Sequence, residues 1–489
     1  MQNIYPLSYK VFNLDSAVGV VARVIKLMKI HTKVLGIYGI TGITIAGILT
    51  PRTLPIMAKY GFASTFFYII AALLFFIPTA LACAELATGW PQKGGSYAWV
   101  SAAFGSGTGF LTVWLEWVNN VAAFPMNLVF LTTALAYIFD PSLAQNKAYL
   151  VTLMLVIFWG VTLLNLFGIR ISSIFSGFGM LLGTLLPIGL IILLGFGWWL
   201  NGQTMQIQFN LHTFIPDVHF HSAVLFVSVI LGYAGMQVAA FHIHEAKNPQ
   251  RDFPKALAIS ALVIILASVL GTLAIAIVVP EKNINLVTGI FQAINLFFSQ
   301  YHLQWFVSLI ALLIVIGSLA SLNTWLIAPA KGLHASVQDG HLPKFLQKTN
   351  QKGAPTSILF CQGLITTLLA LLFLYMPSIN SSYWLLLSLT AILTFIMDIL
   401  ILSAVIRLRY TQPDKPRAYK IPGGLPAVWI ICGAGILVCL FGVALGFTPP
   451  NQLKTGNAHF YHAFLIGGLL VLGAPAFFMS FKRKQKSVV

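Results

Sequence analysis

The sequence predicts an all-α protein that crosses a membrane twelve times. Its 489 residues have a mean hydropathy of +0.88, and 58% of them are hydrophobic while only 8% are charged. A soluble chain of this length would need far more charged side chains to cover its surface. Apolar runs of about 20 residues, the length that crosses a bilayer as a helix, recur along the whole chain. The composition therefore leaves no room for a separate soluble domain.

The apolar runs define the predicted spans in order. Each is bounded by polar residues, glycine or proline, and the third is long enough to be tilted in the bilayer. The predicted spans are 35–57, 62–87, 109–139, 147–168, 174–200, 222–243, 255–280, 303–330, 355–377, 381–407, 421–447 and 458–481.

The loop charges predict the orientation of these spans. With the N-terminus in the cytoplasm, the inner segments carry 23 of the 28 Lys and Arg residues and the outer segments carry 5. Positive residues are concentrated in cytoplasmic loops, so this bias supports an even number of spans and cytoplasmic termini. The net charge of +17 then reflects orientation in membrane lipid, and nucleic acid is not an expected partner.

Two spans contain signals that interrupt a helix. The first reads "GIYGITGITIAGILTPRTLP", with four glycines followed by two prolines, and the sixth contains Gly232 and Gly235. The two spans enter the membrane from opposite sides, and such a pair is typical of a transporter built from inverted repeats. Unwound backbone is tolerated there only where it lines a cavity. The alternative is that these glycines serve close helix packing.

Asp398 and Glu116 are the candidates for a coupling or proton-carrying group. Asp398 lies in the middle of the tenth span, where a charged side chain is costly and by default functional. A structural hydrogen-bond partner for a neighbouring helix is an equally weighted alternative. Glu116 lies between Trp114 and Trp117 and either faces the cavity or lies nearer the interface.

Metal and sodium sites are the less favoured interpretations of two other motifs. His242 and His244 are two residues apart, so on a helix they point in different directions. This is not the spacing of a zinc metalloprotease, and we expect no metal ion, cofactor or catalytic residue. Span eight contains hydroxyl and amide groups that could hold Na⁺, although such groups in membrane helices more often bond to backbone. They are Ser318, Ser321, Asn323 and Thr324.

Several segments resemble amino acid permeases of the amino acid–polyamine–organocation superfamily. They are "AELATGWPQKGGSYAWV" (84–100), "HEAKNPQRDFPKAL" (244–257) and "WLIAPAKGLHASVQDGHLPKFLQKTNQKGAPTSI" (325–358). "YKIPGG" (419–424) and "LGFTPP" (445–450) look most like the bacterial glutamate/GABA exchanger branch. The resemblance runs from about residue 34 to residue 481.

The resemblance implies a domain organisation and a substrate site. Residues 1–34 would be a cytoplasmic segment, 35–407 a core of five plus five inverted spans, 408–481 two peripheral spans, and 482–489 a short basic cytoplasmic tail. Spans one and six would be discontinuous around a site at the middle of the membrane. The residues implied to bind substrate there are Thr44, Ile45, Ala46, Gly47, Gly232, Tyr233, Ala234 and Gly235, with Trp325 covering the site.

Two candidate site residues depart from the pattern of the superfamily. Gln237 stands where a glutamate is common in span six, and Ser321 stands where the acidic exchangers carry a glutamate in span eight. Residues 171–202 also lack the lysine that some proton-coupled relatives place in span five. These departures weaken a glutamate/GABA assignment and leave amino acid transport intact.

The expected function is secondary transport of an amino acid by alternating access. Exchange for another amino acid or for a decarboxylation product is the first hypothesis, and proton-coupled uptake of neutral amino acids or polyamines is the second. A membrane-embedded enzyme would need a cluster of His, Asp or Ser near one face of the bilayer, and "HIHE" alone fits this poorly. The expected partners are an amino acid, protons and membrane lipid, and the expected location is a bacterial inner membrane.

Overall fold

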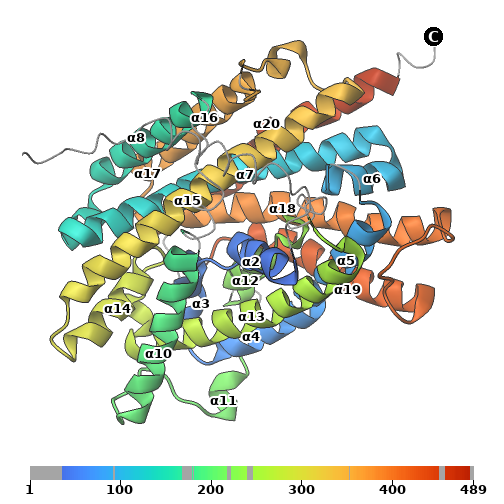
Figure 1. Ribbon diagram of the computed structural model, residues 1–489. Coiled ribbons are helices and arrows are strands. Elements are labelled where there is room, and N and C mark those ends of the chain that lie inside the picture. Colours follow the sequence, from blue (N-terminus) through green and yellow to red (C-terminus); the bar gives the residue numbers. More distant parts are fainter. Residues whose placement is uncertain are drawn as a thin grey trace, which may run out of the picture.

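The computed structural model describes most of the chain as helices joined by short turns (Figure 1). Within the described part no residue lies in a β-strand. The described residues are 36–91, 94–167, 179, 181–216, 222–238, 246–351, 353–450 and 457–484.

Within the described residues, eleven stretches are long and apolar enough to cross a membrane, and the sixth predicted span appears as a shorter apolar helix. Together they confirm the predicted twelve-span, all-α fold. In order, the spans are α2 (Ile37–Ile48) with α3 (Leu54–Ala58), α4 (Ala63–Ala71) with α5 (Ile77–Gly89), α7 (Ser106–Phe139), α8 (Lys147–Leu166), α10 (Leu186–Leu200), α12 (Phe226–Tyr233), α13 (Pro249–Val278), α15 (Trp305–Ala335), α16 (Thr356–Ala370) with α17 (Leu372–Tyr375), α18 (Ile379–Thr411), α19 (Gly424–Gly446) and α20 (Ala458–Lys484).

Shorter elements join or extend these spans. Those outside the predicted spans, such as the helices 96–104 and 289–299, were not predicted from the sequence. α6 precedes α7, α14 lies between the seventh and eighth spans, and two π-helical turns extend α5 and α10 at their N-terminal ends. The remaining elements are α6 (Ser96–Phe104), α11 (Leu211–Phe214), α14 (Gly289–Ser299), the π-helical η2 (Ala72–Phe76) and η4 (Leu181–Leu185), and the 3₁₀ turns η1 (Pro51–Thr53), η3 (Pro141–Gln145), η5 (Ser222–Leu225), η7 (Glu281–Asn283), η8 (Ser336–Asp339) and η9 (Lys344–Gln347).

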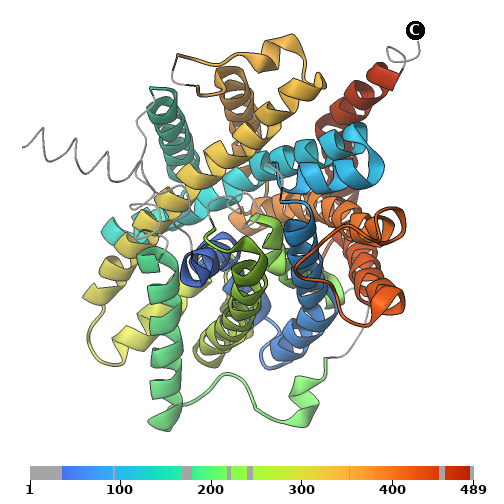
Figure 2. The ribbon, with the colours of Figure 1, turned by 45° about the vertical axis from the view of Figure 1, so that its right-hand side comes forward.

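The depth of each span in the bundle follows from how much of it is buried. In the most apolar 18-residue stretch of α18, 83% of the residues are buried. In α20 only 17% of the corresponding stretch is buried, so α20 lies at the edge of the bundle. The short helices α2 and α12 lie near the middle of the bundle, with longer helices around them (Figures 1 and 2). The two interrupted spans are therefore enclosed by protein, as unwound backbone in a membrane requires.

Two glycines allow a close crossing between the fifth and eighth spans. Gly183 lies in η4 and Gly317 in α15, and a Cβ atom on Gly317 would lie 2.5 Å from the Cα atom of Gly183. Pro187 has no N–H group to donate to the carbonyl of Gly183, which is consistent with the wider π-helical turn at this point. Both glycines also line the central cavity described below.

A buried charge cluster ties the end of α5 to the last turns of α18 and to the segment that follows it. The Glu85 carboxylate accepts from Arg409 Nε at 2.6 Å and from Arg417 Nη1 at 2.7 Å, and it also accepts from the backbone N–H of Ile421 at 2.9 Å. Arg417 also stacks over the ring of Trp90. Glu85, which the sequence marks as an ionisable residue within a span, therefore has a structural role here.

Candidate functional site

Span one is interrupted at Leu49 and Thr50. α2 ends at Ile48, and Thr50 adopts an extended conformation with φ −142° and ψ 134° before η1 begins at Pro51. Proline disfavours a helical conformation in the residue before it and has no N–H group of its own, so Pro51 sets the position of the break. The implied substrate-binding residues 44–47 therefore lie in the last turns of α2, before the break, because membrane helices tolerate glycine in their interior.

Span six is interrupted where its glycines predict. α12 ends at Tyr233, Ala234 is extended, and Gly235 has a φ of +117° that an L-residue rarely adopts. A Cβ atom on Gly235 would lie 3.4 Å from Cγ1 of Ile48, the last residue of α2. The two breaks therefore face each other across van der Waals contact.

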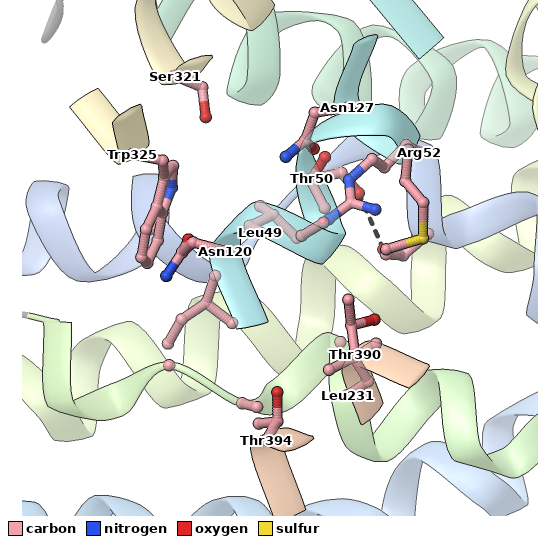
Figure 3. Close-up of a pocket in the computed structure, with 18 of the residues that line it drawn as sticks. Leu49, Thr50, Arg52, Asn120, Asn127, Leu231, Ser321, Trp325, Thr390 and Thr394 are labelled. Atoms are coloured by element: carbon pink, nitrogen blue, oxygen red, sulfur yellow. Dashed lines mark hydrogen bonds between the residues drawn. The ribbon is translucent and has the colours of Figure 1, made fainter. Parts of the chain in front are cut away.

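A cavity of about 160 Å³ lies between the two breaks. A single water molecule needs roughly 10–15 Å³ by the same kind of measure, so the space holds a small solute or several water molecules. Figure 3 shows side chains from the break after α2 and from η1, α7, α12, α15 and α18 converging on it. Its polar side chains are Thr50, Arg52, Thr53, Glu116, Asn119, Asn120, Asn127, Thr184, Ser228, Gln237, Ser318, Ser321, Trp325, Thr390 and Thr394.

Most of the predicted substrate-site residues, together with the coupling candidate Glu116, line this cavity. They come from both interrupted spans, from α7 and from α15. They are Ala46, Gly47, Gly232, Ala234, Gly235, Gln237, Ser321, Trp325 and Glu116.

Four predicted residues lie outside the cavity lining. Thr44 and Ile45 are buried within α2, where the Thr44 hydroxyl donates to the carbonyl of Ile40 at 2.9 Å. Tyr233 stacks on Phe76 with ring centroids 4.5 Å apart and lines a small neighbouring cavity instead. Asp398 lies next to Met397, which does line the main cavity.

The two candidate coupling carboxylates are both buried, and their surroundings differ. Glu116 is 4% exposed, and its Oε2 accepts a hydrogen bond from Ser96 Oγ of α6 at 2.9 Å. Asp398 is also 4% exposed, but its Oδ2 has no hydrogen-bond partner among the described residues. Such an unpaired polar atom inside a protein is costly unless a proton or another ligand compensates it.

Several residues that line the cavity were not predicted from the sequence. Arg52 was counted with the outer loop charges, although it follows the break directly and faces the cavity. Glu116, Asn120 and Asn127 are four and seven residues apart along α7, a spacing that places them on one face of a helix. This spacing could have predicted from the sequence that Asn127 lines the cavity, whereas no neighbouring sequence feature predicted it for Arg52.

Two residues of the candidate sodium motif form hydrogen bonds within the protein. Asn323 Oδ1 accepts from Asn165 at 2.7 Å, and the Thr324 hydroxyl donates to the carbonyl of Ala320 at 3.0 Å. Ser318 and Ser321 remain at the cavity surface. The "HIHE" residues His242, His244 and Glu245 lie outside the described residues.

Comparison with known proteins identifies the family. A family model described as amino acid permease matches residues 24–470. An uncharacterized transporter of Legionella pneumophila is 44% identical over 440 residues, which cover 90% of this chain and 95% of that protein. A glutamate/gamma-aminobutyrate antiporter of Lactococcus lactis is 31% identical over 450 residues, 90% of this chain and 89% of the antiporter.

A more distant relative carries a different name. A probable agmatine/putrescine antiporter of Lactococcus lactis is 23% identical over 371 residues, 75% of this chain and 78% of its own length. The family model and the closer relatives agree with the motifs and with the paired helix breaks. The chain therefore belongs to the amino acid permease family of the amino acid–polyamine–organocation superfamily.

Proposed function

We propose that this protein is a secondary transporter that exchanges one amino acid for another amino acid or for a decarboxylation product. The observation that carries the proposal is the polar cavity between two facing helix breaks. In transporters built from inverted repeats, substrate binds at such breaks and the two halves rock around it. Alternating access of this cavity to the two sides of the membrane is the proposed mechanism.

The ends of α2 and α12 offer a binding site for the substrate ammonium group. Each helix ends at the cavity, and the last carbonyl groups of a helix have no partner within it. These carbonyl groups also carry the negative end of the helix dipole, which favours a cation. The residues proposed to hold the substrate backbone groups are Ala46, Gly47, Gly232, Ala234 and Gly235, with Gln237, Ser321 and Trp325 beside them.

Of the remaining predicted residues, Thr44, Ile45 and Tyr233 are proposed to act indirectly by shaping the two breaks. Tyr233 packs against Phe76, and Thr44 lies in the turn of α2 that precedes the break. Trp325 lies over Gly47, because a Cβ atom there would be 3.9 Å from the indole ring. This contact supports a role for Trp325 in covering the bound substrate.

Exchange is favoured by the names of two relatives, which are both antiporters. Proton-coupled uptake is the second candidate, because Glu116 and Asp398 supply buried carboxylates beside the cavity. The relatives are transporters, which supports a function without catalysis of a chemical reaction. The proposed location is a bacterial inner membrane with both termini in the cytoplasm, in line with the loop charges.

Counterflow in proteoliposomes tests the proposal. Purified protein would be reconstituted into vesicles that are empty or preloaded with one amino acid, and uptake of the same labelled amino acid would be followed. Uptake that requires the preload supports exchange, with protein-free vesicles as the control. Net uptake into empty vesicles driven by a pH gradient would instead support proton symport.

A further inference from the structure

Arg52 places a positive charge on the wall of the cavity. It lies in η1, one residue after Pro51, and its side chain is half-buried. Among the described residues that line the cavity it is the only cation, and Glu116 is the only acid. No described carboxylate forms an ion pair with Arg52, because the ion pairs of the described part join Glu85 to Arg409 and Arg417.

The guanidinium group of Arg52 is held in place and still has donors to spare. Its Nη1 donates to the hydroxyl of Tyr383, a fully buried residue of α18, at 3.3 Å. A guanidinium carries five N–H donors, so most remain available to a ligand. An arginine oriented by one neighbour and lacking a counter-ion is preorganised to bind a carboxylate with two parallel hydrogen bonds.

Arg52 and Glu116 reach the cavity from different elements, η1 and α7. Figure 3 draws Arg52 toward the same side of the cavity as Asn127, with Trp325 toward the opposite side. The described lining thus carries one positive group, Arg52, drawn on the side of Asn127 in Figure 3, which suits a solute with an anionic group directed at Arg52.

We infer that Arg52 binds a carboxylate of the transported solute and so makes the cavity selective for amino acids over diamines. This inference rests on the proposed transport function. A carboxylate accepts hydrogen bonds from the guanidinium, whereas a diamine is cationic at both ends and is repelled by Arg52. The side chain therefore favours one solute class and opposes the other.

Decarboxylation of an amino acid removes the carboxylate on its α-carbon. Loss of the α-carboxylate from a neutral or basic amino acid leaves an amine without any carboxylate. Only a dicarboxylic amino acid keeps one carboxylate after this loss. If both exchange partners must bind Arg52, the decarboxylation that supplies the outgoing partner acts on an acidic amino acid.

Binding of four probes to the purified protein tests the inference. Glutamate, 4-aminobutyrate and ornithine carry a carboxylate, and putrescine is ornithine without it. We expect at least one carboxylate probe to bind the wild-type protein and putrescine to bind at least tenfold more weakly. We expect Arg52→Gln to weaken binding of the carboxylate probes by about 10- to 100-fold, the range for charge-assisted hydrogen bonds. Putrescine should not weaken in this variant.

Three further variants serve as controls. Lys59→Gln removes another positive charge close to the end of the same span, outside the cavity lining, and should leave the probe preference unchanged. Tyr383→Phe removes the hydrogen bond that orients Arg52 and should weaken the carboxylate probes less than Arg52→Gln does. Arg52→Lys keeps the positive charge but lacks the paired N–H groups of the guanidinium. This variant should still bind putrescine weakly, and it provides a test even if Arg52→Gln fails to fold.

The outcomes separate this inference from the proposed function. If the wild-type protein binds putrescine as tightly as the carboxylate probe that it binds best, the inferred role of Arg52 is overturned and the proposed transport function is not. The role of Arg52 would also be overturned if its variants bind the carboxylate probes no more weakly than Lys59→Gln does. Failure of the wild-type protein to bind or exchange any amino acid would instead overturn the proposed transport function and, with it, this inference.

Discussion

At the scale of single residues, Asp398 is the side chain whose burial most needs a functional reason. It lies in the deeply buried helix α18, and one of its carboxylate oxygens has no described partner. An ionised carboxylate in such a place is costly, and taking up a proton removes that cost. We therefore propose that Asp398 gains and loses a proton during transport.

Substitution of Asp398 by Asn tests this proposal. An amide has nearly the shape of the carboxyl group and cannot carry a transferable proton, so we expect the pH dependence of exchange to flatten. Exchange rates in proteoliposomes buffered equally on both sides would measure it. Asp414→Asn, at an exposed site beyond the end of α18, is the matched control and should keep the wild-type profile. A wild-type rate and profile in Asp398→Asn would contradict the proposal.

The residue scale also shows where sequence reasoning reaches its limit. Gly235 was predictable because a glycine in an apolar run suggests an unusual backbone, and its φ of +117° bears this out. Thr44 and Ile45 were implied by the family resemblance, and they lie one turn before the break because Pro51 constrains the backbone that precedes it. Arg52 could not be assigned to the cavity from the sequence, because its neighbours come from helices distant in the chain.

At the scale of helices, the crossing of η4 and α15 depends on two glycines. A side chain at either Gly183 or Gly317 would overlap the backbone of the other element. Small residues at such a crossing let two membrane helices approach closely. Because both glycines also line the cavity, this crossing sets part of the cavity wall.

Replacing Gly317 by Ala should push the two elements apart. The added methyl group meets backbone that cannot rotate away, so we expect a loss of about 1–3 kcal/mol in stability, typical of overpacking. Thermal unfolding of the purified protein in detergent would measure the loss. Exchange activity should fall in parallel, because the cavity wall moves.

Gly189→Ala, in α10 just beyond Gly183 of the same crossing, is the control. Nothing lies within 4 Å of a Cβ atom at this position, so the substitution should be neutral or slightly stabilising. An unchanged unfolding temperature in Gly317→Ala would mean that the two elements separate without cost, contrary to this account of the crossing.

Helices that lie between the spans were harder to predict than the spans themselves. Long apolar runs predicted eleven of the spans well because length and hydropathy alone define them. α6 begins with "SYAWV", which reads as a loop in the sequence, yet its Ser96 supplies a hydrogen bond to Glu116. α14 has only eleven residues and mixes polar with apolar side chains, so no hydropathy window detects it as a span.

At the scale of the whole molecule, the paired breaks relate the two halves of the core. α2 and α12 end at a common cavity, and their ends touch at Ile48 and Gly235. Each break lies in the first span of its five-span half, so the halves enter the membrane with opposite orientation. A substrate held at this contact can be reached from either side if the halves move relative to each other.

The orientation of the molecule in the membrane can be measured with engineered cysteines. Lys282 follows the seventh span and Lys344 the eighth, and both side chains are exposed. The excess of positive residues in the inner segments predicts that Lys282→Cys faces the outside and Lys344→Cys the cytoplasm. In a background without native cysteines, a membrane-impermeant maleimide should label intact cells only at residue 282 and should label both positions after permeabilisation. The reverse pattern would place both termini outside, whereas labelling of both positions in intact cells would mean that α15 does not cross the membrane between them.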